Sequence, residues 1–143
     1  QGPVDGFCSG VGTGGTLSGI GEVLREHNPR LLIWAVEPEN AAILSGGSVG
    51  THLQMGIGDG LIPGNLNRDI YDEVCVVTDE EALGTARELA EREGILCGIS
   101  SGSNVAAALR LARKLGRGKR VVTVLPDTGE RYFSTPLFRR APC

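Results

Sequence analysis

The chain has 143 residues, which fits one domain, and 41% of them are hydrophobic, enough to build a folded core. A formal net charge of −3 and an aromatic content of 4% give no basic field and few stacking platforms, so nucleic acid is set aside as a partner. No apolar run approaches the length of a membrane span, and no secretory signal peptide opens the sequence.

The first half of the chain alternates apolar runs with glycine or proline breaks. A helix is expected after the first glycine cluster, with Leu17, Ile20 and Leu24 on its inward face, and it ends at Asn28-Pro29 because proline cannot continue a helix. The expected elements are a strand at 4–9, this helix, an apolar strand at 31–36, a short helix at 40–44 and an ordered loop at 46–66.

In the second half, Thr78 and Glu81 form the pattern of a capping box, and Gly94 is placed to end the helix that follows. The other expected elements are strands at 74–77, 95–97 and 120–125 and a helix at 103–115. Because strands and helices alternate, the sequence predicts an α/β fold with a mainly parallel sheet flanked by helices. Such sheets bind ligands at the carboxyl ends of their strands.

The four cysteines are not arranged as metal ligands. None forms a CxxC pair and only two histidines are present, so no metal site is predicted. Three of the cysteines lie in apolar runs, which favours buried packing and reduced thiols, and hence a cytoplasmic location. The cysteines are Cys8, Cys75, Cys97 and Cys143.

A glycine-rich loop, residues 10–16, joins the first strand to the first helix. Backbone N–H groups at a helix N-terminus bind anions, and Thr13 and Thr16 add hydroxyl donors. The loop is not a Walker motif, but Gly10, Gly12 and Gly15 fit GxGxxG, and Glu37 lies where a dinucleotide fold places its ribose-binding acid. This loop alone leaves three readings open: a nucleotide site, another phosphate site and a structural turn.

A serine-rich segment, residues 98–103, follows the predicted strand at 95–97 and opens a helix. Helix capping by Ser101 or Ser103 would explain one of its serines but not the run.

Four motifs together resemble the cysteine synthase family of fold-type II pyridoxal-phosphate enzymes. They occur in that family's order and cover nearly the whole chain, and they are Gly12-Thr-Gly-Gly-Thr16, Gly56-Ile-Gly-Asp-Gly-Leu-Ile-Pro-Gly-Asn65, Gly98-Ile-Ser-Ser-Gly102 and Pro126-Asp-Thr-Gly-Glu-Arg-Tyr132. The resemblance implies that residues 1–143 are the C-terminal portion of the large cofactor-binding domain, truncated at its N-terminal side. The implied cofactor is pyridoxal 5'-phosphate.

The resemblance also implies roles for particular residues. Gly12, Thr13, Gly14, Gly15 and Thr16 would hold the cofactor phosphate. Ser100 would hydrogen-bond the pyridine nitrogen, and Gly56, Gly58 and Asp127 would line the cleft. Asp59 stands where many members of the family carry a small residue, which leaves the substrate open.

The implied reaction is a β-replacement that forms L-cysteine from O-acetyl-L-serine and sulfide, by a homodimer that can bind serine acetyltransferase. The family's Schiff-base lysine precedes the glycine loop. The two lysines here, Lys114 and Lys119, lie in polar surroundings typical of a surface. We therefore expect no catalytic residue in this chain and no activity from it alone.

Three alternatives remain. The first is a sister activity of the same family, such as cystathionine β-synthase or serine dehydratase. The second is a Rossmann NAD-binding domain, and the third is a non-catalytic interaction module.

Overall fold

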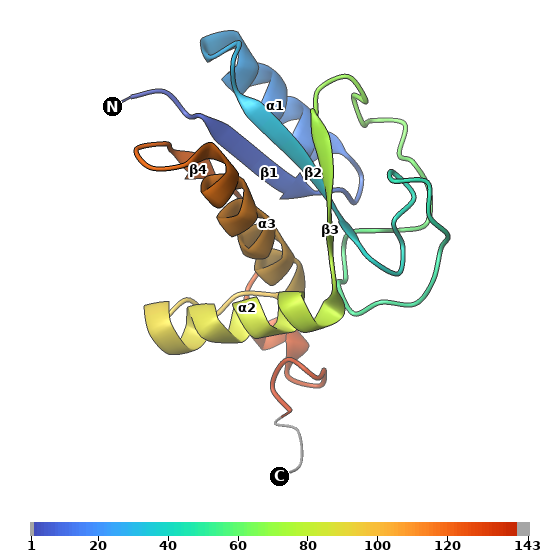
Figure 1. Cartoon of the computed structure of the whole chain (residues 1–143). Coiled ribbons are helices and arrows are strands. Elements are labelled where there is room, and N and C mark those ends of the chain that lie inside the picture. Colours follow the sequence, from blue (N-terminus) through green and yellow to red (C-terminus); the bar gives the residue numbers. More distant parts are fainter. Residues whose placement is uncertain (1, 140–143) are drawn as a thin grey trace.

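The computed structural model describes residues 2–139, which fold around one parallel sheet (Figure 1). The sheet has the order β3-β2-β1-β4, and each neighbouring pair of its strands is parallel. The α/β class and the parallel sheet predicted from the sequence are therefore confirmed. The elements are β1 (Gly6–Gly10), α1 (Gly15–His27), β2 (Leu32–Pro38), β3 (Glu73–Val77), α2 (Asp79–Glu93), α3 (Ile99–Leu115), β4 (Val121–Val122) and the short 3-10 helix η1 (Gly129–Tyr132).

Both faces of the sheet are buried. On β2, Ile33 and Ala35 point to the face that packs against α1, whereas Trp34 and Val36 point to the face that packs against α2 and α3. Side chains alternate along a strand, so a strand covered on both sides reads as one apolar run. Trp34 on the predicted apolar strand is buried, and the predicted burial of Cys8, Cys75 and Cys97 is confirmed; Cys143 lies outside the described residues.

The predicted capping box at the start of α2 is present. The hydroxyl of Thr78 accepts from the Glu81 N–H at 3.1 Å, and the Glu81 carboxylate accepts from the Thr78 N–H at 3.0 Å. Gly94 ends the helix in the left-handed conformation, at φ 69°. On α1, Leu17 is buried as expected, but Ile20 is 36% exposed and Gly21 takes its place against the sheet.

Three predicted elements were wrong. Residues 95–97 form no strand of the sheet, because the caps Gly94 and Gly98 leave only a short link between α2 and α3; Cys97 instead makes an isolated antiparallel bridge to Thr128. Residues 40–44 form turns rather than a helix. The helix expected at 103–115 starts earlier, at Ile99, so the serine segment is its first turn.

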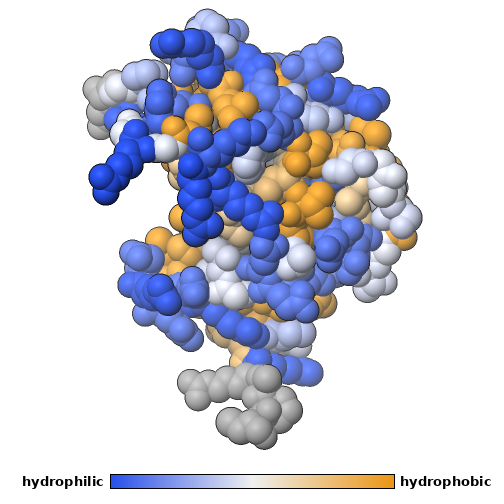
Figure 2. All heavy atoms as spheres, viewed as in Figure 1, coloured by the Kyte–Doolittle hydropathy of each residue, from blue (hydrophilic) through white to orange (hydrophobic). Residues whose placement is uncertain are grey.

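The surface shown in Figure 2 mixes hydrophilic residues with several apolar patches. Among the described residues, Leu61 and Phe133 are each 62% exposed and Val49 is 60% exposed. No helix in residues 2–139 combines the length and the apolar character that crossing a bilayer requires.

Candidate functional site

A cavity of about 810 Å³ opens at the carboxyl end of the sheet, where β1 and β4 separate. After β1 the chain continues to β2, which pairs with one edge of β1, whereas β4 pairs with the opposite edge of β1. This is the topological switch point at which parallel sheets bind ligands. The lining residues are Ser9, Gly10, Gly12, Thr13, Gly14, Thr16, Met55, Gly56, Ile57, Ser100, Asn104, Val124, Pro126, Asp127, Arg131 and Tyr132.

The cavity brings together residues from all four sequence motifs, which lie far apart in the chain. Gly12, Thr13, Gly14 and Thr16 lie on one wall, and Gly15 is the first residue of α1 directly behind them. Gly56, Ser100 and Asp127 lie on the other walls.

The glycine loop depends on a close approach of two backbones. A β-carbon at position 12 would lie 2.2 Å from the carbonyl oxygen of Gly56, and one at position 14 would lie 2.8 Å from the Cα of Leu66. Gly14 also has a φ of 83°, which L side chains rarely adopt. The loop therefore takes glycine at these two positions for steric reasons, beyond the needs of an ordinary turn.

The N-termini of α1 and α3 differ from that of α2. Gly14 caps α1 and Gly98 caps α3, neither with a side-chain hydrogen bond, and neither helix has an acidic residue in its first turn. The first turn of α2, which lies away from the cavity, carries three acidic residues and the Thr78 capping box. Uncapped N–H groups and the positive end of the helix dipole favour an anion. The N-termini of α1 and α3, which lie nearest the cavity, can therefore still bind an anion.

Ser100 lies in the first turn of α3 and is 4% exposed, at the edge of the cavity. The capping roles considered for Ser101 and Ser103 are absent: Gly98 is the cap, and the hydroxyl of Ser103 donates instead to the Gln54 side chain at 2.8 Å. The serine run therefore does not act as a helix cap.

Asn104, one turn after Ser100 on α3, holds the two separating strands together. Its Oδ1 accepts from the Gly10 N–H at 2.7 Å, and its Nδ2 donates to the Val124 carbonyl at 2.9 Å. The hydroxyl of Thr123 adds a bond to the Cys8 carbonyl at 2.7 Å. These side-chain bonds replace the ladder beyond Val122, which is why the strand predicted at 120–125 has only two residues. Sequence reasoning missed Asn104.

Asp127 sits beside the N-terminus of α3. The Gly98 N–H donates to its backbone carbonyl at 3.2 Å, and a β-carbon on Gly98 would lie 2.0 Å from Asp127 Oδ1. Oδ2 accepts from the Tyr132 hydroxyl, while Oδ1 is buried without a partner in the described part of the chain. A buried oxygen without a partner, in a wall of the cavity, is suited to accept a hydrogen bond from a ligand or from water.

The Tyr132 phenol is held in its neutral form. Burial first, and then the hydrogen bond to Asp127, raise its pKa from the ordinary value of 10.0 to about 12. Because the folded-state pKa lies above the unfolded value, this group's stabilising contribution is complete below pH 10.0 and is lost as pH rises toward 12.

We therefore expect the Tyr132 phenolate to form only near the alkaline unfolding transition. The measurement is a spectrophotometric titration of wild type and Tyr132→Phe, because their difference isolates Tyr132 from Tyr71. The denaturation midpoint of wild type is expected to fall more steeply than that of the variant over the same range. Titration of Tyr132 near its ordinary pKa in the folded protein would contradict this.

Two residues predicted for the cleft or its specificity are not among those that line the cavity. Gly58, at φ 70°, packs against Pro38, and its N–H donates to the Val11 carbonyl at 3.0 Å. Asp59 is exposed and is not among the cavity-lining residues. The turn reaches the cavity through Met55, Gly56 and Ile57 instead.

Glu37 does not occupy the position of a ribose-binding acid. Glu37 is 2% exposed, and its carboxylate accepts from the N–H groups of Leu44, at 2.8 Å, and Ser45, at 3.0 Å, and from the Ser45 hydroxyl. These bonds also explain why residues 40–44 form turns. A carboxylate already satisfied by the chain has little to offer a ribose, which removes the main support for the dinucleotide reading.

The two lysines lie at the surface, as predicted. The Lys114 ammonium pairs with Glu73 and lies 5.5 Å from the centre of the Trp34 ring, and Lys119 pairs with Asp5 at 3.0 Å. Their side chains are 49% and 48% exposed. Neither is among the residues that line the cavity.

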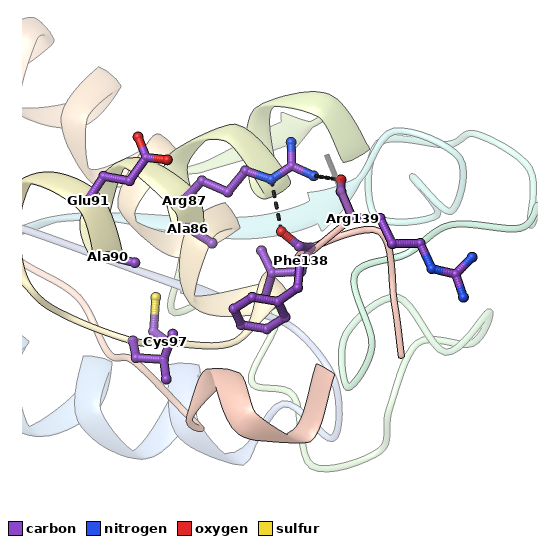
Figure 3. A pocket seen from close by; sticks show the side chains of 9 residues that line it. Ala86, Arg87, Ala90, Glu91, Cys97, Phe138 and Arg139 are labelled. Carbon is purple, nitrogen blue, oxygen red and sulfur yellow. Dashed lines mark hydrogen bonds between the residues drawn. The ribbon is translucent and has the colours of Figure 1, made fainter. Parts of the chain in front are cut away.

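A second pocket, of about 530 Å³, lies between α2 and the C-terminal segment 137–139. Figure 3 shows Arg87 reaching from α2 to the backbone of this segment, where it donates to the Leu137 carbonyl at 2.9 Å and the Arg139 carbonyl at 3.3 Å. Apolar side chains such as Ala86 and Phe138 dominate its wall, and none of the predicted site residues lies there.

The fold and the cavity define a parallel α/β protein whose cleft lies at the carboxyl ends of its strands. The sequence model described as "Pyridoxal-phosphate dependent enzyme" matches residues 1–127. The chain belongs to this family.

Individual proteins show the same relationship. The cysteine synthase of Staphylococcus aureus (strain N315) is 53% identical over 135 residues, which cover 94% of this chain and 44% of that protein. The O-acetyl serine sulfhydrylase isoform 3 of Entamoeba histolytica is 39% identical with a TM-score of 0.94, over 99% of this chain and 42% of that one. The O-acetylserine dependent cystathionine beta-synthase of Helicobacter pylori is 38% identical with a TM-score of 0.90, over 95% of this chain and 44% of that one. The chain thus spans less than half the length of these relatives.

Proposed function

We propose that this chain forms the cofactor-binding part of an enzyme that makes L-cysteine from O-acetyl-L-serine and sulfide. The observation that carries the proposal is the shared cavity: the uncapped start of α1 and Ser100 on α3 line the same space. The 53% identity to a cysteine synthase supports this choice among the activities of the family.

The residues present suit pyridoxal phosphate. The cavity of about 810 Å³ has room for a molecule of that size. The phosphate is assigned to the backbone N–H groups of residues 12–16 and the hydroxyls of Thr13 and Thr16, since that wall offers donors and no acid. The ring nitrogen is assigned to Ser100, and the unpartnered Oδ1 of Asp127 offers an acceptor on the same side.

When bound, the cofactor supplies a ring that withdraws electrons from the carbon undergoing reaction. The chain's own residues fix and tune that ring. The glycine loop anchors one end of the molecule, and Ser100 presents a neutral hydroxyl to the other. A hydroxyl, unlike an aspartate, leaves the ring nitrogen largely uncharged, which weakens electron withdrawal and favours loss of a β-substituent over transamination.

The test uses the purified 143-residue chain with pyridoxal phosphate. We expect reversible binding that inorganic phosphate competes, and no covalent label on Lys114 or Lys119 after borohydride reduction, read by mass spectrometry. We also expect no cysteine formation from O-acetyl-L-serine and sulfide by this chain alone. NAD binding that pyridoxal phosphate does not compete would overturn the cofactor assignment, and turnover near that of an intact cysteine synthase would overturn the expected inactivity.

A second candidate activity is the O-acetylserine-dependent synthesis of cystathionine. It rests on the Helicobacter pylori neighbour and its TM-score of 0.90. The two activities differ in the attacking thiol, so a comparison of sulfide with homocysteine, made with the protein that contains this chain, separates them. We further propose a homodimer and the binding of serine acetyltransferase, both of which rest on the family resemblance, and a cytoplasmic location, which rests on the free buried cysteines.

A further inference from the structure

Gln54 is a fully buried amide, 0% exposed, in the otherwise irregular segment between β2 and β3. It does not line the cavity, but it directly precedes Met55, Gly56 and Ile57, which do. A side-chain amide sealed from water is stable only where its N–H₂ and its carbonyl both find partners. Its partners therefore show what this segment is built to hold.

The Gln54 amide bonds three separate elements. Its Nε2 donates to the Val77 carbonyl at the end of β3, at 2.9 Å, and to Asp79 Oδ1 at the start of α2, at 3.0 Å. Its Oε1 accepts from the Ser103 hydroxyl on α3 at 2.8 Å. The neighbouring Leu53 N–H adds a bond to Asp79 Oδ2 at 2.9 Å. One side chain thus holds the segment against both helices and the edge strand.

These bonds reach the cavity from two directions. On one side, Ser103 lies three residues after Ser100, one turn along the same helix. On the other side, the backbone carbonyl of Gln54 accepts from the Ile57 N–H at 3.4 Å. The Gly58 N–H then donates to the backbone carbonyl of Val11 at 3.0 Å. The Gly56 carbonyl oxygen, which lies in this turn, is the atom against which Gly12 packs. A continuous set of contacts therefore links the serine end of α3 to the glycine loop.

We propose that Gln54 is a positioning residue that sets the spacing between the two walls of the cavity, without touching what binds there. Loss of the amide frees the turn at 54–58 to move relative to α3, so a ligand that contacts both walls binds less tightly. Only this last consequence rests on the proposed cofactor site; the positional role stands on the contacts themselves.

The test compares Gln54→Leu and Ser103→Ala with Thr78→Ala. Leucine keeps much of the volume and removes every bond of the amide, whereas Ser103→Ala removes the donor to Oε1 and the longer bond from the same hydroxyl to the Ile99 carbonyl. Thr78→Ala is the matched control, because it breaks the cap of α2 next to Asp79 but leaves the Gln54 bonds in place. Amide hydrogen exchange at Gly58 reports opening of the turn, and equilibrium dialysis reports the dissociation constant for pyridoxal phosphate.

At matched global stability, we expect exchange at Gly58 to be at least about tenfold faster in Gln54→Leu than in Thr78→Ala, with a smaller increase in Ser103→Ala. The dissociation constant for pyridoxal phosphate is expected to rise about tenfold or more in Gln54→Leu and to stay near the wild-type value in Thr78→Ala. Ser103→Thr, which restores a hydroxyl, is expected to recover Gly58 protection.

Equal exchange at Gly58 in Ser103→Ala, Gln54→Leu and Thr78→Ala would overturn the positioning role. If Gln54→Leu does not fold, the contrast between Ser103→Ala and Ser103→Thr decides the matter. If wild type binds no pyridoxal phosphate, the proposed function fails, and the exchange data still decide the role of Gln54.

Discussion

Gly12→Ala is expected to weaken pyridoxal phosphate binding about 100-fold. The new β-carbon would lie 2.2 Å from the Gly56 carbonyl oxygen, a backbone atom that moves only with its whole turn. The glycine loop or the Gly56 turn then shifts, and phosphate hydrogen bonds are lost. Each charge-assisted bond is worth roughly 1.5–3 kcal/mol and each tenfold in affinity about 1.4 kcal/mol, so one or two lost bonds give an effect of this size.

The matched control is Gly19→Ala on α1. It makes the same chemical change on the helix that follows the glycine loop, but a β-carbon there meets nothing within 4 Å. We expect it to leave binding unchanged and to raise stability by roughly 0.5–1 kcal/mol, because alanine favours a helix over glycine. Dissociation constants for pyridoxal phosphate and inorganic phosphate, with melting curves for all three proteins, separate lost binding from lost folding. Wild-type affinity in Gly12→Ala would contradict the proposed phosphate site.

Asn104→Ala is expected to cost about 2–5 kcal/mol of unfolding free energy. Asn104 is 1% exposed, and its removal leaves the half-buried Gly10 N–H and Val124 carbonyl without their partner, each at the lower part of the roughly 1–3 kcal/mol that applies to a buried group. The segments after β1 and β4 then lose the Asn104 bridge at the cavity and keep the bond from the Thr123 hydroxyl to the Cys8 carbonyl. Urea denaturation measures the change directly.

Asn104→Asp refines this expectation. The carboxylate keeps the acceptor for Gly10 but sets a negative oxygen against the Val124 carbonyl, so protonation of the new side chain restores a donor. The loss of stability is therefore expected to be smaller at about pH 5 than at about pH 8. Asn67→Ala is the control, because the Asn67 side chain also makes two bonds, donating to Glu22 and accepting from the Asp69 N–H, but both are exposed, so its loss is expected to cost less than about 1 kcal/mol. An equal cost for Asn104→Ala and Asn67→Ala would contradict the bridging role.

Local signals in the sequence were enough for much of the fold. The capping box at Thr78 and Glu81 uses residues three apart, so its pattern is visible in any short window. The apolar run at 31–36 reads correctly as a strand because both faces of the sheet are covered. The apolar residues at 95–97 give the same signal, yet they form the link between α2 and α3, in which Ile95 and Leu96 are exposed and only Cys97 is buried.

The parts of the site that sequence reasoning missed depend on distant partners. Asn104 stands in an alanine-rich helix and bonds Gly10, 94 positions away. Gln54 bonds Ser103, 49 positions away. A lone amide in either setting looks like an ordinary polar residue. Glu37 shows the opposite error, since its place along the chain fits a ribose-binding acid while its carboxylate faces the loop at Leu44 and Ser45.

The pairing of β1 with β4 has a consequence for how the chain folds during synthesis. Gly6 lies opposite Val121, so one side of β1 lacks the partner seen in the fold until β4, more than 100 residues later, has been synthesised. Contacts between such distant positions form late, because the entropy of closing a large loop is lost before the contacts add any stabilising free energy. Until then the open edge of the first strand can pair with other nascent chains. We expect this protein to need dilution or a chaperone during refolding, and truncations ending before residue 121 to aggregate rather than fold into a smaller unit.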